Sequence, residues 1–418
     1  MDILAAVAPP THQGRAFDLL SGTSMAAPHV AGLAAIFKAQ HPDWSPMAIK
    51  SALMTTAYDT KNRDGSASTD LFAQGAGEVD PSRMLSPALI YDAGQQDWLG
   101  YLEGLGIATG TGVPVIAPSN YNQASIADGN IVDSTVINRR VTAVIPGLYR
   151  ASISVPGFRA TVSPSILNFT GSGQTQQFNV TLTRTSAPLN TYADGYLTWT
   201  GGNTKVRSPV AVRPIAVRSS QPAVQIIGTA GSVSWTVTSG ITGAFPITAN
   251  GMAAATDQPG EVTPTTRQQF TMTVAAGTKL ARFATHVPND TTGADIDLVV
   301  ARLDSAGNSA VVGQSGGPTA NETIDLVNPV PGTYLAQVSG FAAAPGTTST
   351  AYTFRDFLID GTAAAGHLTV DPAKPTTQAG QTITVTASVN DLNADQPYLG
   401  WVEYIDGTGT TVEANPDQ

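Results

Sequence analysis

A serine placed directly before an expected helix is the first feature of this sequence that could do chemistry. Ser24 lies among small residues in the string SGTSMAAPHVAG, residues 21–32, which leaves room for a substrate backbone to approach closely. A serine hydroxyl attacks a carbonyl carbon only when a neighbouring base, usually histidine, takes its proton. A helix starting here would bring N–H groups and its positive dipole end to the reacting centre. We interpret Ser24 as a candidate nucleophile, although a serine before a helix more often serves only as an N-cap.

The sequence offers few bases for this serine. His12 is the one histidine ahead of Ser24, and its string PPTHQGRAF indicates a loop. We interpret His29 as a structural residue on the helix and His41 as a residue at the helix end, near the negative end of the dipole. The histidines of the β-rich region are not expected to act as the base; these are His286 and His367.

Two helices are expected after the first twenty residues. The first spans about residues 24–40, with Pro28 near its first turn, where a missing N–H matters least. The second begins with Ser45 as its N-cap and Pro46 at its first helical position. A short helix is expected at 94–106.

Beyond about residue 110 apolar and polar residues alternate in short runs between Gly, Pro, Asn and Asp. Such runs predict strands with one buried face, and at this spacing they are typical of antiparallel sandwiches. The predicted fold class is therefore mixed, an α/β segment followed by antiparallel β-sandwich modules. The residues expected to point inward are Phe178, Val180, Leu182, Val206, Val210, Val212, Ile383, Val385, Ala387 and Val389.

Composition narrows the classes of partner. The 418 residues carry 21 Lys and Arg against 31 Asp and Glu, a formal net charge of −10, which argues against nucleic acid or an anionic membrane. The sequence has no cysteine, which excludes disulfides and thiolate chemistry. No apolar run approaches the roughly 18–20 residues that span a bilayer, and the first ten residues lack the basic start of a signal peptide. We expect a monomer.

The string around Ser24 resembles the serine motif of the subtilases, the subtilisin-like serine peptidases. Further strings follow the family's order: DILAAV before the motif, then HPDWSPMAIKSALMTTA, FAQGAGEVDPSRMLSPALIYDAG, SPSILNFT and YADGYLTWTGGNTKVRSPVAVRP. The string FAQGAGEVDPSRMLSPALIYDAG is similar to plant, cucumisin-like subtilases. SPSILNFT and YADGYLTWTGGNTKVRSPVAVRP resemble the fibronectin-III-like domain of those enzymes. The resemblance covers about residues 1–215. It implies a serine endopeptidase that acts on polypeptides, with Ser24 as nucleophile and its backbone N–H as one oxyanion donor.

The sequence also lacks motifs that the family uses for catalysis. The family's Asp-Ser/Thr-Gly and His-Gly-Thr-His motifs and its Ala-Gly-Asn string do not occur ahead of Ser24. We therefore expect a carboxy-terminal part of a secreted subtilase, inactive alone, with the signal peptide in a missing amino-terminal part. The alternative is a non-catalytic, secreted β-module protein for adhesion or substrate targeting. An α/β-hydrolase also has a serine turn, but it needs a parallel sheet downstream, and the downstream chain here predicts sandwiches.

The resemblance also has a consequence for packing. In subtilases the serine helix covers a central parallel sheet, and most of that sheet would be encoded upstream. Without it the apolar face of the first helix lacks a partner surface of matching size, so we expect residues 1–60 to be loosely ordered. The residues concerned are Val30, Leu33, Ile36 and Phe37.

Four regions are expected along the chain. They are a catalytic-domain remnant at 1–108, a fibronectin type III-like domain at 109–217, a β-sandwich at 223–362 that resembles the pre-peptidase C-terminal domain, and a partial immunoglobulin- or fibronectin-like segment at 363–418, with linkers near 218 and at 360–367. Asp295 and Asp297 alternate on one expected strand, so they share a face and could help bind a structural calcium. A solvated face explains the pair equally well, and no other cofactor or metal is expected.

Overall fold

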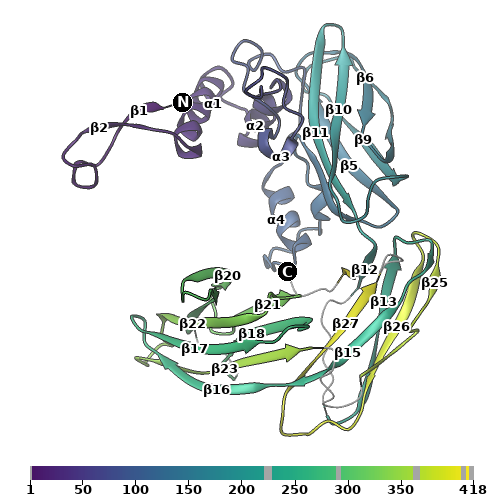
Figure 1. The fold of residues 1–418 in the computed structure, drawn as a ribbon. Helices are drawn as coiled ribbons and strands as arrows, with labels where there is room; N and C mark the ends of the chain where they lie inside the picture. Colours follow the sequence, from purple (N-terminus) through teal and green to yellow (C-terminus); the bar gives the residue numbers. More distant parts are fainter. Residues whose placement is uncertain (1, 221–227, 289–292, 361–367, 406–410, 414–418) are drawn as a thin grey trace. The chain divides into compact units, whose positions relative to one another are not determined.

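The computed structural model describes residues 2–220, 228–288, 293–360, 368–405 and 411–413. The chain divides into two compact units, Met1–Ile215 and Ala216–Gln418. The described helices all lie in the first unit, and β-strands build most of the rest (Figure 1). No helix within the described ranges has the length and apolar character to cross a membrane.

The first unit begins with a hairpin and a set of helices. The hairpin pairs β1 (Ile3–Ala6) with β2 (Phe17–Leu20) in antiparallel register. The helices are α1 (Thr23–Gln40), α2 (Pro46–Thr55), α3 (Leu71–Gln74) and α4 (Gln95–Gly104), with 3-10 turns at Pro9–Thr11 and Pro118–Asn120. The three longer helices match those expected from the sequence, which confirms these predictions.

Local sequence explains where these helices start. Ser45 caps α2, since its hydroxyl oxygen accepts the Ala48 N–H at 2.9 Å, and Pro46 follows in the first turn. At α1 the helix already begins at Thr23, which puts Pro28 inside the helix rather than near its first turn. Because proline has no N–H, the Ser24 carbonyl loses the partner that an α-helix would give it.

Helix α1 packs at its carboxyl half only. Phe37 is 0% exposed in a core that α1 shares with Ile49 and Leu53 of α2. The expectation that the whole apolar face lacks a partner is therefore wrong for Phe37 and Leu33, which pack in or against this core. Val30 and Ile36 stay 40% and 46% exposed.

Two sheets and one shared core form the rest of the first unit. The sheets have the orders β4–β11–β10–β6–β8 and β3–β5–β9–β7, and every pair is antiparallel except parallel β4–β11. The inward residues expected on β9 and β11 are at most 1% exposed, which confirms those predictions. The strands are β3 (Leu89–Ile90), β4 (Ile126–Ile131), β5 (Ser134–Ala143), β6 (Gly147–Ser154), β7 (Phe158–Ser163), β8 (Ile166–Phe169), β9 (Thr175–Arg184), β10 (Ala193–Gly201) and β11 (Thr204–Pro214).

The helical segment and these sheets are joined by shared structure, so the expected boundary at 108/109 is not a clean division. Strand β3 from the helical segment pairs with β5, and Tyr91, 1% exposed, lies in the core of the sheets. On β11, Arg207 donates to the Asp59 carboxylate at 2.6 Å and to the Ala76 carbonyl at 3.1 Å. The same guanidinium lies 4.4 Å from the ring centre of Tyr196.

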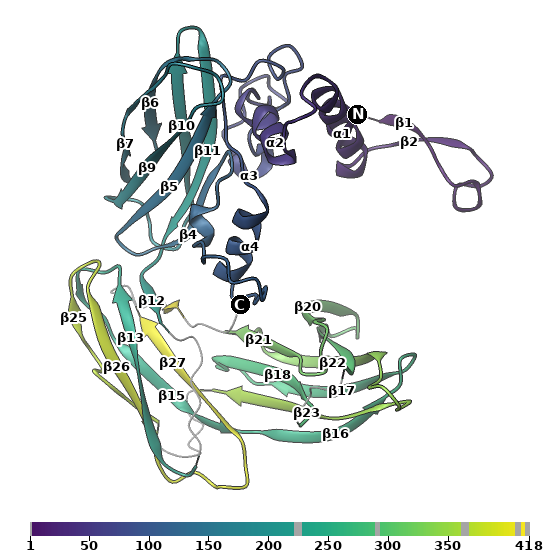
Figure 2. The same ribbon diagram turned by 180° about the vertical axis from the view of Figure 1, so that it is seen from behind.

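The second unit consists of strands in several sheets (Figures 1 and 2). One group has the sheets β12–β13–β26–β24, β15–β27–β28 and β14–β25, and the other has β16–β23–β18–β21 and β17–β22–β19–β20. The strands are β12 (Val217–Ser219), β13 (Gly231–Ser239), β14 (Gly243–Ala244), β15 (Ile247–Ala254), β16 (Thr256–Val262), β17 (Arg267–Val274), β18 (Leu280–His286), β19 (Asp295–Leu303), β20 (Ser309–Ser315), β21 (Thr323–Val327), β22 (Gly332–Ala342), β23 (Thr350–Ile359), β24 (Thr369–Asp371), β25 (Thr376–Thr377), β26 (Thr382–Val389), β27 (Tyr398–Ile405) and β28 (Thr411–Glu413).

The pairing in this unit differs from the division expected at 362/363. Strand β26 pairs with β13 from Gly231↔Val389 to Thr238↔Thr382, and β27 pairs with β15. The carboxy-terminal strands therefore complete sheets begun at 231–254, and the strands of 256–359 are inserted between the two halves. The expected linkers lie largely outside the described residues, at 221–227 and 361–367, and Arg218 and Ser219 belong to β12.

One buried carboxylate in the inserted strands lacks a basic partner of its own. Asp356 on β23 is 5% exposed and lies opposite the buried Phe283 of β18. Burial, and secondly the nearby charge of Asp257, raise the pKa of Asp356 to about 6. A carboxyl group with a raised pKa opposes folding once it must ionise.

We expect the free energy of unfolding to fall between pH 4 and pH 7 because of Asp356. The Asp356 carboxyl ionises near pH 4 in the unfolded chain and near pH 6 in the folded one. The stabilisation that the protonated carboxyl gives below pH 4 is therefore lost as the pH rises from 4 to 7. The total loss in the free energy of unfolding is about 3 kcal/mol. Urea unfolding at each pH, comparing Asp356→Asn with the unmodified chain, measures this loss. Asp304→Asn is the control, because hydrogen bonds, first that from the Asn308 side chain, hold the pKa of Asp304 below this window. A pH profile that Asp356→Asn leaves unchanged would contradict the prediction.

Candidate active site

Ser24 is the second residue of α1, and its side chain is exposed. In this position its backbone N–H belongs to the first helical turn, whose N–H groups have no acceptor four residues back. Within the described residues, no hydrogen bond to the Ser24 hydroxyl is found. The site therefore has a serine and a helix amino terminus open to solvent, with no base in contact.

His12 has a carboxylate partner that the sequence did not reveal. Its Nδ1 lies 3.3 Å from Asp18 Oδ2, and Arg15 donates to the same carboxylate at 3.2 Å. The backbone N–H of Leu19 and the His12 ring hold the pKa of Asp18 below its usual value. A histidine oriented by a carboxylate is the pair that activates a serine in hydrolases. Here the pair lies at the hairpin, and no hydrogen bond links it to Ser24.

The other histidines near the motif have structural contacts. His29 Nδ1 lies 2.7 Å from the Met25 carbonyl, and because a carbonyl only accepts, this nitrogen carries the proton. His41 ends α1: its N–H donates to the Phe37 carbonyl at 2.7 Å, and its ring stacks on Trp44 at 4.2 Å. These contacts fit the structural roles expected for both residues.

The remaining candidates are dispersed. Asp2 accepts a hydrogen bond from the Ser21 hydroxyl at 2.5 Å, so its carboxylate is engaged beside the motif but not with a histidine. His286 ends β18 in the second unit and is exposed, and His367 lies outside the described residues. Among the described residues of the first unit, no hydrogen bond joins Asp2 to Ser24.

The two aspartates considered for calcium share one face of β19. Burial, and then the charge of Asp297, raise the pKa of Asp295, whose Oδ1 has no hydrogen-bond partner. Among the described residues, no group of three or more His, Asp or Glu side chains is arranged to hold a metal ion. Calcium binding stays a prediction from the sequence.

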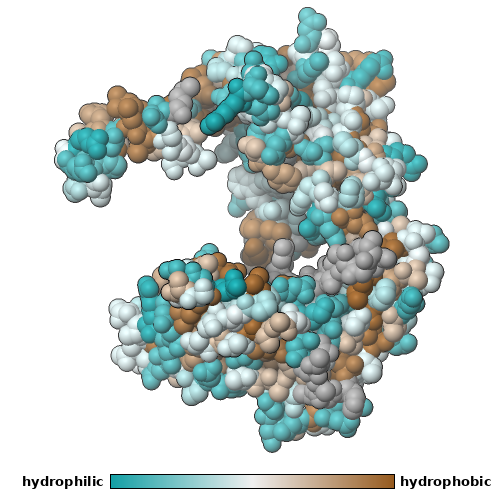
Figure 3. Space-filling view, in the orientation of Figure 1, coloured by the Kyte–Doolittle hydropathy of each residue, from teal (hydrophilic) through white to brown (hydrophobic). Residues whose placement is uncertain are grey.

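Apolar surface is exposed at α1 and on the hairpin. A hollow of ≈ 510 Å³ lies between α1 and α2, with Val30, Ile49 and Met54 among its walls. On the hairpin, Leu4 and Phe17 are 67% and 62% exposed, and Figure 3 shows hydrophobic surface on this segment. Exposed apolar surface of this kind marks a site of interaction.

Comparison with protein families identifies both parts of the first unit. Residues 4–77 match the family model "Subtilase family", and residues 120–212 match the model "Fibronectin type-III domain". The amino-terminal half of the chain is therefore similar to subtilisin-like serine proteases and to the fibronectin type-III domain.

Curated relatives agree with this assignment. Subtilisin-like protease SBT1.3 of Arabidopsis thaliana is 38% identical over 223 residues, which are 47% of this chain and 28% of that protein. Subtilisin-like protease SBT3.6 of the same plant is 36% identical over 235 residues, 51% of this chain and 30% of that protein. The chain thus spans less than a third of the length of these relatives.

Among solved structures, tripeptidyl peptidase 2 aligns with 85% of this chain and 27% of its own, at 14% identity. The TM-score of 0.28 is low, so this likeness carries no argument about the fold. The family assignment rests on the sequence matches alone.

Proposed function

We propose that the chain provides the serine-bearing part of a secreted serine endopeptidase that cleaves polypeptides, with Ser24 as the nucleophile. The observation that carries the proposal is the position of Ser24 at the amino terminus of α1 inside the segment that matches the subtilases. There the Ser24 N–H would be one donor to the oxyanion, whereas the N–H groups of Met25 and Ala26 already donate to the Gly22 carbonyl.

We propose further that the 418-residue chain does not hydrolyse peptides alone. A serine hydroxyl is a weak nucleophile at neutral pH without a base. Among the described residues, neither His29, whose Nδ1 contacts the Met25 carbonyl, nor His12, whose Nδ1 contacts Asp18, has a hydrogen bond to the Ser24 hydroxyl. The base and its orienting acid would come from a segment that carries the Asp and His motifs implied by the family resemblance.

The test is labelling of the purified chain with a fluorophosphonate, which reacts with activated serines. We expect no labelling above that of Ser24→Ala, because the hydroxyl stays protonated. Strong labelling that Ser24→Ala removes would contradict this expectation and would show that a base reaches Ser24, with His12→Ala as the variant to examine first.

A non-catalytic role in adhesion or substrate targeting is the second candidate. It is supported by the extent of the second unit, Ala216–Gln418, which lies outside both matched segments. If that role were the whole function, the chain joined to a complete set of catalytic partners would still not cleave peptides. A chimera that joins the amino-terminal catalytic part of a plant subtilisin-like protease to this chain distinguishes the two candidate functions, because only the first predicts that it cleaves peptides.

A further inference from the structure

Apolar side chains of two paired strands in the second unit, β13 and β26, differ in how far they are buried. Along the inner face of β13, Val237 is 0% exposed, Trp235 is 7% exposed and Val233 is half-buried. Along the paired strand β26, exposure rises from 0% at Val385 to 6% at Val389. Exposure on β13 thus rises toward the end of the sheet that holds Val233, whereas on β26 Ile383 at the opposite end is half-buried too.

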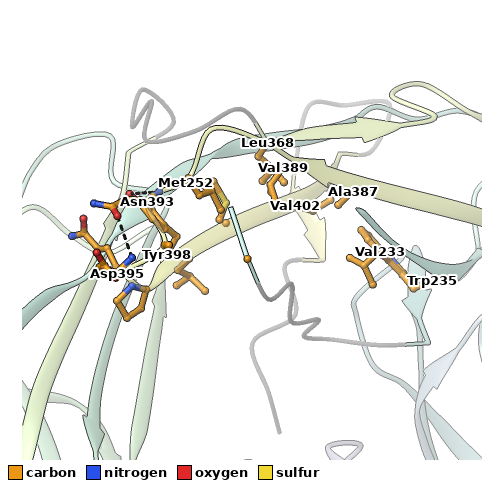
Figure 4. Close-up of a pocket in the computed structure, with 17 residues that line it drawn as sticks. Val233, Trp235, Met252, Leu368, Ala387, Val389, Asn393, Asp395, Tyr398 and Val402 are labelled. Atoms are coloured by element: carbon orange, nitrogen blue, oxygen red, sulfur yellow. Dashed lines mark hydrogen bonds between the residues drawn. The ribbon is translucent and has the colours of Figure 1, made fainter. Parts of the chain in front are cut away.

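A cavity of ≈ 570 Å³ lies at the end of the sheet that holds Val233 (Figure 4). At one end of the cavity Trp235 is fixed, because its Nε1 donates to the Tyr404 hydroxyl at 2.9 Å. This volume is within the range of small-molecule sites. The walls come from two sheets and are apolar, with Val233, Ala387 and Val389 on one and Met252 and Val402 on the other.

The polar groups of the cavity gather at the other end, as Figure 4 shows. Asn393 accepts the Asp395 N–H at 3.1 Å, and its own N–H donates to the Tyr398 hydroxyl at 3.4 Å. The Asp395 carboxylate is exposed there, and none of the described lining residues is basic. A negatively charged head group would meet only like charge at this end.

We propose that this cavity binds an amphiphile with a single hydrocarbon tail and a neutral or positively charged head. The tail would lie between Trp235 and Met252, a rigid aromatic floor and a flexible side chain that adapts to irregular ligands. The head would lie beside Asn393 and Asp395. Each further methylene buried should tighten binding about fourfold, from the transfer free energy of one CH₂ group.

The test uses N-phenyl-1-naphthylamine, an uncharged dye that fluoresces in apolar sites, with the full chain. We expect 1-decanol and decylamine to displace the dye, and decanoate to do so at least tenfold less well. In Asp395→Asn the affinity for decylamine should fall roughly threefold at low salt, the effect of losing one exposed ion pair, while decanol is unaffected. Displacement by decanoate as strong as that by decylamine would overturn the proposal.

Two variants of β26 locate the site. Ala387→Phe fills the cavity and should abolish dye binding, whereas Thr384→Phe, on the exposed face of the same strand, should leave it unchanged. Equal binding by both variants would overturn the assignment. Hydrogen exchange of the unmodified chain covers the case in which Ala387→Phe does not fold: decanol should protect the amides of 392–402, and protection confined to other segments rules the cavity out.

Discussion

Replacing Ser24 by alanine is expected to lower kcat by about 10⁶-fold once the missing partners are supplied, as removal of the nucleophile does in subtilisin itself. The enzyme for this measurement is a chimera in which the amino-terminal catalytic part of a plant subtilisin-like protease precedes Met1. The physical reason is that Ser24 would provide the attacking oxygen, for which alanine has no substitute. Hydrolysis of a fluorogenic peptide measures the loss.

The control for this prediction is Ser21→Ala in the same chimera. Ser21 lies in the same motif, and its hydroxyl donates to Asp2 at 2.5 Å, so the variant removes a hydroxyl without removing the nucleophile. We expect Ser21→Ala to keep kcat within about tenfold, since the loss of one exposed hydrogen bond has a modest effect. A chimera that stays active with Ser24→Ala would contradict the assignment of the nucleophile.

The largest stability effect is expected for Trp199→Ala in the fibronectin III-like sheets. Trp199 is 0% exposed and makes an edge contact with Phe178, with ring centres 5.0 Å apart. Removing a buried tryptophan leaves a cavity and should lower the free energy of unfolding by about 3–5 kcal/mol. Urea unfolding followed by circular dichroism measures the change.

Trp98→Ala is the matched control, the same substitution at a side chain that is 40% exposed on α4. We expect a loss of about 1 kcal/mol or less there, because surface changes create no sealed cavity. Similar losses for the two variants would mean that Trp199 is not at the centre of a packed core.

Much of the local structure could be predicted from the sequence. The N-cap at Ser45 and the following Pro46 are signals confined to a few residues, and the structure confirms the start of α2. The alternation of apolar and polar residues predicts that Phe178, Val180 and Leu182 are buried, since one face of a strand repeats every two residues. The structure confirms that all three are buried. Signals of this kind need no knowledge of the partner element.

The long-range pairing could not be predicted in the same way. The run at 382–389 predicts a strand, but nothing in it indicates that β13, with 256–359 inserted between them, is its partner. For the same reason 363–418 was expected to be a partial module, and the expected segment 1–108 includes Leu89 and Ile90, which pair with β5. Alternation defines which face is buried and leaves the neighbour open.

At the candidate site too, features that depend on adjacent residues could be predicted and features that depend on distant residues could not. The string around Ser24 identified the serine and the helix start, because both depend on adjacent residues. The pairing of His12 with Asp18 depends on the return of the hairpin, which no short motif indicates. The cavity at Trp235 was missed entirely, since it is formed by strands from both ends of the second unit.

We propose that Ser24 acts as the nucleophile of a subtilisin-like peptidase. The most direct measurement is mass spectrometry of peptides from the active chimera after fluorophosphonate treatment. We predict that the adduct lies on the peptide containing Ser24, and that its amount rises in parallel with the loss of hydrolysis. An adduct on another serine, or full inhibition with Ser24 unmodified, would contradict the claim.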